Sequence, residues 1–158
     1  MSKLQTPFRY DFVGSFLRPQ ALKDAKAAYR DGKITKEEFD KVVNEEITKV
    51  VEKQKELGFH AITDGEFRRT FWHLDFMWGF DGVAHENTGN GVKFDAELAV
   101  LDDTYLVGKI KAKAHPFVEY FKFLKQFEDE NCIARQTMPA PAQLLAELYR
   151  EDNGKNTD

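Results

Sequence analysis

A long amphipathic helix followed at once by a short apolar run is the feature that most restricts the fold of this chain. Thr35 and Glu38 form a capping box, and apolar residues then recur at helical spacing for about six turns. Gly58 stands where a helix-ending glycine is expected, and the apolar run 59–62 follows as a predicted strand. That run breaks into two acids and two arginines within 64–69. Polar groups at the carboxyl end of such a strand are typical of the sites of α/β enzymes.

The remaining segments alternate between strand and helix patterns. Strands are expected at 8–16, 59–62, 104–112 and 132–137, and helices at 20–30, 35–57, 115–128 and 144–150. The aromatic segment 71–80 matches neither period, 87–91 is expected to be a turn or loop, and the polar tail at about 151–158 is expected to fray.

Helices between successive strands favour parallel βαβ units, so we expect one α/β domain over 1–158. Three or four strands are too few to close a barrel of eight. An open sheet of that size would leave an edge strand uncovered.

Composition excludes several classes of protein. The chain has 158 residues, of which 42% are hydrophobic and 13% aromatic, enough for a folded core. Its net charge of -4, with acids and bases intermixed, gives no reason to expect a nucleic-acid or membrane partner. Cys132 is the single cysteine, which excludes an internal disulfide and any zinc site with two thiolates from this chain. Without a signal segment or an apolar span, a cytoplasmic location is expected.

Two residues near predicted strand ends are the first candidates for ligand contacts. Glu66 could bind an ammonium group, act as a general base or ligate a metal; the alternative is a surface salt bridge to Arg68 or Arg69. Ser15 could bind a carboxylate with its hydroxyl and neighbouring amides, because Gly14 lets the backbone approach a ligand. The alternative for Ser15 is a turn or helix cap.

Arginines and aromatic residues form a second group of candidates. Arg18, Arg68 and Arg69 could clamp an anion through paired hydrogen bonds, or could lie on the surface. Trp72 could stack on a flat ligand or belong to the core. His73 is the best-placed histidine, but no second histidine or cysteine stands at metal-ligand spacing, so no zinc site is expected within the chain.

Four segments occur in an order that carries a family resemblance. They are 13–19 (VGSFLRP), the capped helix, 63–69 (TDGEFRR) with Trp72 and His73 after it, and 136–144 (QTMPAPAQL). Together they resemble the N-terminal part of the short proteins related to the catalytic domain of cobalamin-independent methionine synthase. The resemblance covers roughly residues 8–150. It implies part of a (β/α)8 TIM-type barrel, here truncated, with its site at the carboxyl ends of the strands.

The resemblance also implies an activity and roles for particular residues. Methionine synthases of this family transfer a methyl group from a methyltetrahydrofolate polyglutamate to the thiol of homocysteine, which a zinc ion holds as thiolate. Ser15 and Glu66 occupy the positions that bind the amino-acid portion of homocysteine, and Asp64 replaces the family's histidine. The expected substrate-binding residues are Ser15, Glu66, Gly14, Asp64, Arg18, Trp72 and His73. The family's zinc ligands come from later strands, so no metal ligand or catalytic residue is assigned here.

Three functional interpretations stay open. The chain is a homocysteine-binding part of a zinc methyltransferase barrel that does not transfer a methyl group by itself. Alternatively, it is a non-catalytic binding module that forms homo-oligomers through an exposed sheet edge. A third interpretation is an unrelated α/β enzyme that uses Glu66 and Asp64 as acid and base.

Overall fold

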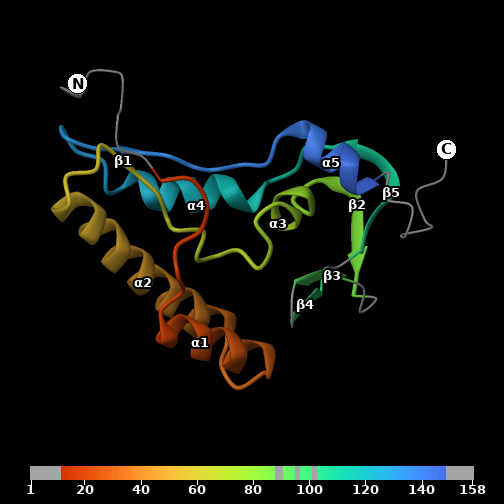
Figure 1. Ribbon diagram of the computed structural model, residues 1–158, viewed down its shortest axis with the longest axis horizontal. Coiled ribbons are helices and arrows are strands. Elements are labelled where there is room, and N and C mark those ends of the chain that lie inside the picture. The colour runs from red at the N-terminus through yellow and green to blue at the C-terminus, as the bar shows by residue number, and fades with distance from the viewer. Residues whose placement is uncertain (1–11, 88–90, 95–96, 101–102, 149–158) are drawn as a thin grey trace. The chain divides into compact units, whose positions relative to one another are not determined.

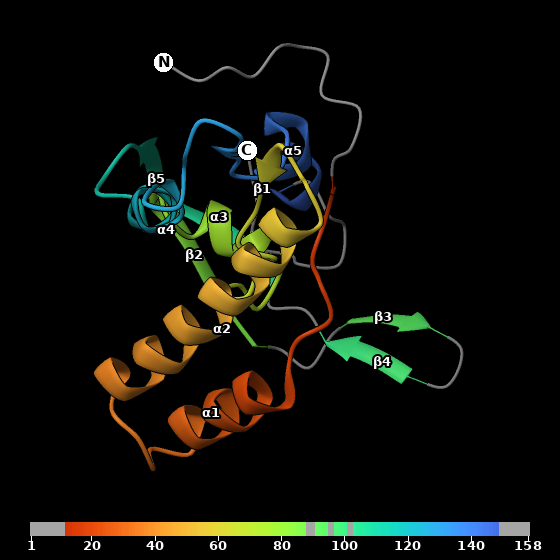
Figure 2. The same ribbon diagram turned by 90° about the vertical axis from the view of Figure 1, so that its left-hand side faces the viewer.

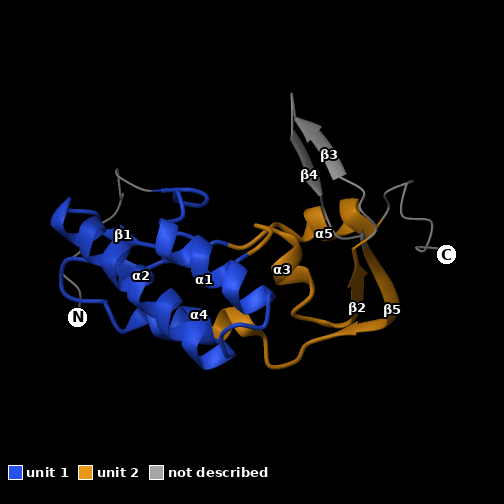
Figure 3. Ribbon diagram, turned by 90° about the horizontal axis from the view of Figure 1, so that it is seen from below, with its two compact units in different colours: residues 1–69, 119–137 blue, residues 70–118, 138–158 orange. Residues whose placement is uncertain are grey.

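The computed structural model describes residues 12–87, 91–94, 97–100 and 103–148 (Figure 1). It divides into two compact units, 1–69 with 119–137 and 70–118 with 138–158, which Figure 3 colours separately. The helices are α1 (Gln20–Arg30), α2 (Lys36–Glu56), α3 (Leu74–Met77), α4 (Pro116–Lys125) and α5 (Pro141–Leu148). The strands are β1 (Ala61–Ile62), β2 (Asp81–Glu86), β3 (Gly91–Phe94), β4 (Glu97–Val100), β5 (Asp103–Lys111) and β6 (Ile133–Ala134).

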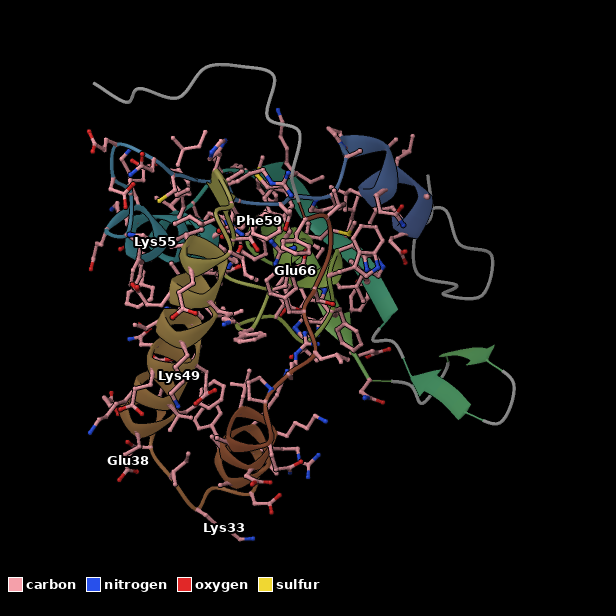
Figure 4. All side chains as sticks on the ribbon, turned by 60° about the vertical axis from the view of Figure 1, so that its left-hand side comes forward. Lys33, Glu38, Lys49, Lys55, Phe59 and Glu66 are labelled. Carbon is pink, nitrogen blue, oxygen red and sulfur yellow. The ribbon has the colours of Figure 1, made fainter. Side chains whose placement is uncertain are left out.

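The start of α2 is fixed by the predicted capping box. The Glu38 amide donates to Thr35 Oγ1 at 3.2 Å, and the Thr35 amide donates to the Glu38 carboxylate at 2.8 Å. Two amides that the helix itself leaves without partners are satisfied in this way. Figure 4 labels Glu38 near this end of the helix and Lys55 near the other.

The end of α2 is fixed by a glycine in the left-handed region. Gly58 has φ +77°, and its amide donates to the carbonyl of Lys55 at 2.9 Å. The next amide, that of Phe59, donates to the carbonyl of Gln54 at 3.0 Å. This pair of bonds is the Schellman motif, which turns the chain sharply out of the helix and into β1.

The core of the first unit forms around the apolar face of α2. The α2 residues Val43, Ile47 and Val51 are at most 1% exposed, and they belong to one cluster with Leu22, Ile62, Phe67, Leu124 and Cys132. Burying each large aliphatic side chain contributes about 1.5–3 kcal/mol. Figures 1 and 2 show α1 alongside the first half of α2, where the rings of Tyr29 and Phe39 stack with centroids 5.1 Å apart.

The two strands of the first unit pair in parallel. Ala61 faces Ile133 and Ile62 faces Ala134, with the Arg135 amide donating to the Ile62 carbonyl at 2.9 Å. The predicted strands 59–62 and 132–137 are therefore confirmed, although both are shorter than expected. Parallel pairing brings residues 63–66 and 135–137 to the same edge, because both segments follow the carboxyl ends of their strands.

The predicted strand at 8–16 is wrong for the part that the structure describes. Residues 12–16 have no strand assignment, and the Phe16 amide instead donates to the Gly65 carbonyl at 3.1 Å. A strand needs a neighbouring strand to satisfy alternate amides along its length. Residues 8–11 lie outside the described part of the chain, as do the predicted tail and most of the loop predicted at 87–91.

The prediction of parallel βαβ units throughout is wrong for the second unit. There β2 pairs with β5 and β3 with β4, and both pairs are antiparallel. Only the strand at 104–112 was expected, and β5 confirms it. The sequence of β2, DGVAHE, has few apolar residues. An antiparallel pair allows this, because one of its faces can be exposed to water.

The helix predictions hold with small shifts in their bounds. α1 has the predicted bounds, α4 lies within the predicted 115–128, and α5 begins at Pro141 rather than at residue 144. Proline suits the first position of a helix, where its missing amide hydrogen leaves no bond unmade. The fold is thus a mixed one of helices and strands. No helix in the described ranges is both long and apolar enough to cross a bilayer.

Replacing Gly58 by alanine tests the end of α2. A Cβ atom there would meet no atom within 4 Å, so the expected loss of about 1 kcal/mol in the free energy of unfolding comes from φ alone. Gly108→Ala is the matched control, since Gly108 is equally uncrowded and lacks a positive φ. Urea unfolding followed by circular dichroism measures both, and equal effects of the two substitutions would contradict the assignment.

Candidate functional site

Residues 63–66 form a buried turn at the carboxyl end of β1, and a side chain of α2 anchors it. Gln54 Oε1 accepts from the Thr63 amide at 2.9 Å, while Gln54 Nε2 donates to the Thr63 carbonyl at 2.8 Å. Gln54 and Thr63 are both 3% exposed. One amide side chain therefore satisfies both backbone groups of a residue that has just left the strand.

Asp64 is a buried carboxylate with one oxygen in use. Its Oδ1 accepts from the Glu66 amide at 2.9 Å, whereas Oδ2 is buried and has no hydrogen-bond partner among the described residues. Burial raises the pKa of Asp64, although the Glu66 amide and the charges of Arg69 and Arg68 act in the opposite direction. The ionised carboxylate is thus under-compensated, which is a common condition of groups that contact ligands.

Glu66 is held in a conformation that residues with side chains rarely adopt. Its φ is +59°, and it is the only non-glycine residue with a positive φ in the described ranges. Such backbone strain costs about 1–3 kcal/mol and clusters at functional sites. Gly65 before it, with φ +62°, has no room for a side chain, because a Cβ atom would lie 2.9 Å from the Phe16 ring.

The Glu66 carboxylate is fixed by two other side chains, and the three side chains contact one another in a closed set. Its Oε1 accepts from the Thr137 hydroxyl at 2.8 Å and lies 3.2 Å from Arg69 Nη1. Arg69 also donates to the Thr137 hydroxyl at 2.9 Å and to the Thr137 backbone carbonyl. Glu66 is 5% and Arg69 2% exposed, so the ion pair is buried rather than on the surface. Figure 4 labels Glu66 in this unit.

The segment 14–18 contacts the same turn. Gly14 has φ +90°, and the bond from the Phe16 amide to the Gly65 carbonyl joins this segment to the turn. The Ser15 side chain between them is exposed. Arg18 Nη2 donates to the carbonyl oxygens of Arg69 at 3.1 Å and of Glu66 at 3.4 Å. Contacts therefore join three predicted residues at this turn, Arg18, Asp64 and Glu66, while Gly14 and Ser15 immediately precede Phe16, whose amide bonds to it.

Trp72 and His73 belong to the second unit, where His73 contacts an acid that the sequence did not indicate. His73 Nε2 lies 3.0 Å from Glu147 Oε1, and the same oxygen accepts from Gln143 Nε2 at 3.1 Å. His73 is 5% exposed, and its Nδ1 has no hydrogen-bond partner in the described part of the chain. Trp72 is 54% exposed, and the centroids of its ring and of the His73 imidazole are 4.5 Å apart.

The described residues do not fit a zinc ion. Within the described ranges, no three histidine, cysteine, aspartate or glutamate side chains gather closely enough to hold a metal. Cys132 is 2% exposed in the core, with its thiol 3.5 Å from the Phe127 carbonyl, and burial raises its pKa. A thiol in such surroundings is a weak metal ligand, because the thiolate is the species that binds.

Sequence reasoning missed three residues that position the site groups. Gln54 carried a signal, since it is a polar residue on the apolar stripe of α2, three positions after the buried Val51. Thr137 lies within a segment that carries the resemblance, but nothing in that segment singles it out. Glu147 stands four residues after Gln143 and so shares a helix face with it.

Comparison with known proteins gives a consistent result. The family model "Cobalamin-independent synthase, Catalytic domain" matches residues 9–96. The uncharacterized protein YxjH of Bacillus subtilis (strain 168) is 38% identical over 89% of this chain and 37% of its own length. A 5-methyltetrahydropteroyltriglutamate–homocysteine methyltransferase of Thermotoga sp. (strain RQ2) is 34% identical over 49% of this chain and 10% of its own length.

A solved structure agrees with these matches. It is the crystal structure of a candidate vitamin-B12 independent methionine synthase from Listeria monocytogenes, with a TM-score of 0.74 and 41% sequence identity. The match covers 92% of this chain and 40% of the Listeria chain. YxjH and the Listeria protein both match most of this chain. The chain spans well under half the length of each of them.

Asp64→Asn tests whether the buried carboxylate lowers stability. Above the raised pKa, Asp64 is ionised in the folded and unfolded chains alike, so its burial lowers the free energy of unfolding by a constant amount. As the pH falls through that pKa toward 3.8, the folded chain takes up the proton first and the loss shrinks. Asparagine keeps an acceptor for the Glu66 amide. We therefore expect it to stabilise the chain at neutral pH, with a gain that vanishes near pH 3.8.

Thermal or urea unfolding at several pH values measures that gain. Asp24→Asn is the control, because Asp24 is exposed and its carboxylate accepts a hydrogen bond from Gln20 on the same helix. A destabilising effect of Asp64→Asn at neutral pH would contradict the claim that the folded chain does not fully compensate the charge of Asp64.

Proposed function

Because the chain belongs to the family of the cobalamin-independent synthase catalytic domain, we propose that its turn 63–66 binds the amino-acid portion of a homocysteine-like substrate. In this proposal the chain is part of a (β/α)8 barrel methyltransferase of methionine biosynthesis, with β1 and β6 as two parallel barrel strands. The methyl donor is a methyltetrahydropteroyl polyglutamate. The name of the Thermotoga relative, which includes both a donor and homocysteine, supports this choice.

One observation carries the proposal: two buried carboxylates lie at the end of β1, and one of their oxygens has no partner within the described part of the chain. Asp64 and Glu66 are 3% and 5% exposed, and Asp64 Oδ2 has no hydrogen bond from the described residues. A substrate ammonium would supply the missing charge and donate hydrogen bonds to this oxygen and to the Glu66 carboxylate. A buried, under-compensated carboxylate is therefore better suited to a cationic group than to an anion.

The carboxylate of the same amino acid is assigned to the segment that approaches the turn. The Ser15 hydroxyl is exposed, and Gly14 leaves the backbone next to it accessible. Arg18 adds positive charge, and its Nε–H is buried without a partner in the part of the chain described. Trp72 and His73 are proposed substrate contacts on the resemblance alone. Zinc would activate the thiol in this family, but no step through a metal follows from the residues described here.

Calorimetry with L-homocysteine tests the proposal. We expect the chain to bind it, and Glu66→Gln to weaken binding about tenfold or more, since a charge-assisted hydrogen bond contributes about 1.5–3 kcal/mol. Ser15→Ala should weaken it less, because a neutral hydroxyl contributes about 1 kcal/mol. The matched control is Glu46→Gln, which removes another buried glutamate, 6% exposed and 2.5 Å from Lys49 Nζ.

The control should leave homocysteine binding unchanged. Circular dichroism of each variant shows whether the fold survives. Thr137→Val removes the hydroxyl that donates to Glu66 Oε1 but leaves the charge of Glu66 in place. Equal affinities for the chain and for a folded Glu66→Gln variant would refute the assignment, as would no binding at all.

A self-associating module is the second candidate, and an exposed apolar pair favours it. Val13 is 89% and Leu17 97% exposed. The phenylalanine before each of them, Phe12 and Phe16, is partly buried. Alternation at every second residue is the spacing of a strand, and the face with Val13 and Leu17 offers two large apolar side chains to a second copy.

Sedimentation velocity at several concentrations tests this second candidate. If the Val13–Leu17 face joins two copies, the chain is dimeric and the double variant Val13→Lys with Leu17→Lys is monomeric. A chain that stays monomeric at all concentrations would rule the module out while leaving homocysteine binding untouched.

A further inference from the structure

Arg68 leaves the turn described above and enters a separate set of contacts. Its Nη2 donates to Asn44 Oδ1 of α2, and its guanidinium carbon lies 5.1 Å from the Tyr120 ring centroid and 5.0 Å from that of Phe123. The Nε–H is buried and finds no hydrogen-bond acceptor among the described residues. Burial lowers the pKa of Arg68, and nearby acids such as Asp64 only partly offset this. The guanidinium is therefore left with an unmet donor and an under-compensated charge.

A cavity of about 170 Å³ adjoins this guanidinium. It is lined by Tyr29 of α1, by Lys36, Phe39, Asp40 and Val43 of α2, by Arg68 and by Tyr120 of α4. Its apolar wall includes Val43, which is 1% exposed, and the Tyr29 and Phe39 rings, which stack at an interplanar angle of 7°. All of these residues belong to the first unit.

The charges around the cavity do not balance. Lys36 Nζ lies 2.5 Å from Asp40 Oδ2, so these two charges offset each other. Among the lining residues Arg68 remains, which leaves one net positive charge from two cations and one carboxylate, and Asp64, which does not line the cavity, offsets the charge of Arg68 only in part. A single excess positive charge suits a monoanion, whereas a phosphate dianion would leave the cavity with a net negative charge.

We propose that this cavity binds a small monocarboxylate with a compact apolar body. The carboxylate faces Arg68 and Lys36, and the body lies against Phe39 and Val43. A cavity of about 150 Å³ admits benzene, so the volume suits a ligand of the size of benzoate. The paired donors of a guanidinium match the two oxygens of a carboxylate. The site is separate from the turn 63–66 and does not rest on the function proposed for it.

Titration with sodium benzoate and with neutral benzamide, at constant ionic strength, tests the proposal by amide NMR shifts of the full chain. Benzoate should bind about tenfold more tightly than benzamide, because the two differ in charge and hardly in shape. Lys36→Met should weaken benzoate binding about threefold, and Asp40→Asn should strengthen it by a similar factor. Neither substitution should change the binding of benzamide.

Lys49→Met is the matched control. Lys49 lies on the same helix, where Figure 4 labels it, and its Nζ is also 2.5 Å from a carboxylate, that of Glu46. Its side chain is 69% exposed against 64% for Lys36, but it does not line the cavity. Benzoate binding should be the same in this variant and in the unchanged chain.

Three outcomes of these titrations would overturn the proposal, and a further variant adds a fourth. The three are no binding of benzoate, equal binding of benzoate and benzamide, and an equal loss in Lys36→Met and Lys49→Met. Arg68→Lys distinguishes a guanidinium contact from simple charge, because it keeps the charge and removes the paired donors. Loss of benzoate binding in this variant, with the fold intact by circular dichroism, supports the site. Unchanged binding would show that Arg68 does not contact the ligand and would also overturn it.

Discussion

The two hydrogen bonds between the Gln54 side chain and the Thr63 backbone determine where β1 ends and where the site begins. β1 is only two residues long, so the chain leaves its parallel partner β6 immediately after Ile62. Gln54 then takes the place of a further strand by satisfying the amide and the carbonyl of Thr63. Because Gln54 stands on the buried face of α2, the packing of that helix sets the position of the turn.

The groups of the turn are held in place at the expense of stability. Glu66 has a strained backbone, and Asp64 has a buried oxygen with no partner among the residues described. Neither feature improves packing or hydrogen bonding within the chain. Strain and unmet polar groups are expected where a fold is organised around a ligand rather than around itself. The set of Glu66, Thr137 and Arg69 supports the same interpretation, because it fixes the orientation of a buried carboxylate at the end of β1.

Local signals in the sequence predicted the helices well and the strands less well. The capping box and Gly58 act within a few residues of α2, so their effect does not depend on the rest of the fold. The antiparallel pair of β2 and β5 depends on a partner about twenty residues away, and β2 has no alternating apolar pattern to reveal it. The segment 12–16 has strand-like alternation of exposure, yet it forms no strand, because pairing depends on neighbours that composition does not specify.

The candidate site was predicted in part, for a similar reason. Glu66, Asp64 and Ser15 stand next to glycines at predicted strand ends, which is a local pattern. Thr137 and Glu147 act through contacts that span 71 and 74 residues, and such contacts follow from the fold alone.

Carbon-13 NMR of the Asp64 carboxyl group tests the central claim most directly, namely that the turn 63–66 holds an under-compensated carboxylate for a cationic ligand. A pH titration of the chain labelled at aspartate, with Asp64→Asn to identify the signal, gives the pKa of this one group. We expect a midpoint above the ordinary value of 3.8, moving downward when L-homocysteine is bound, because its ammonium stabilises the ionised form. A midpoint at or below 3.8 in the free chain would contradict the claim.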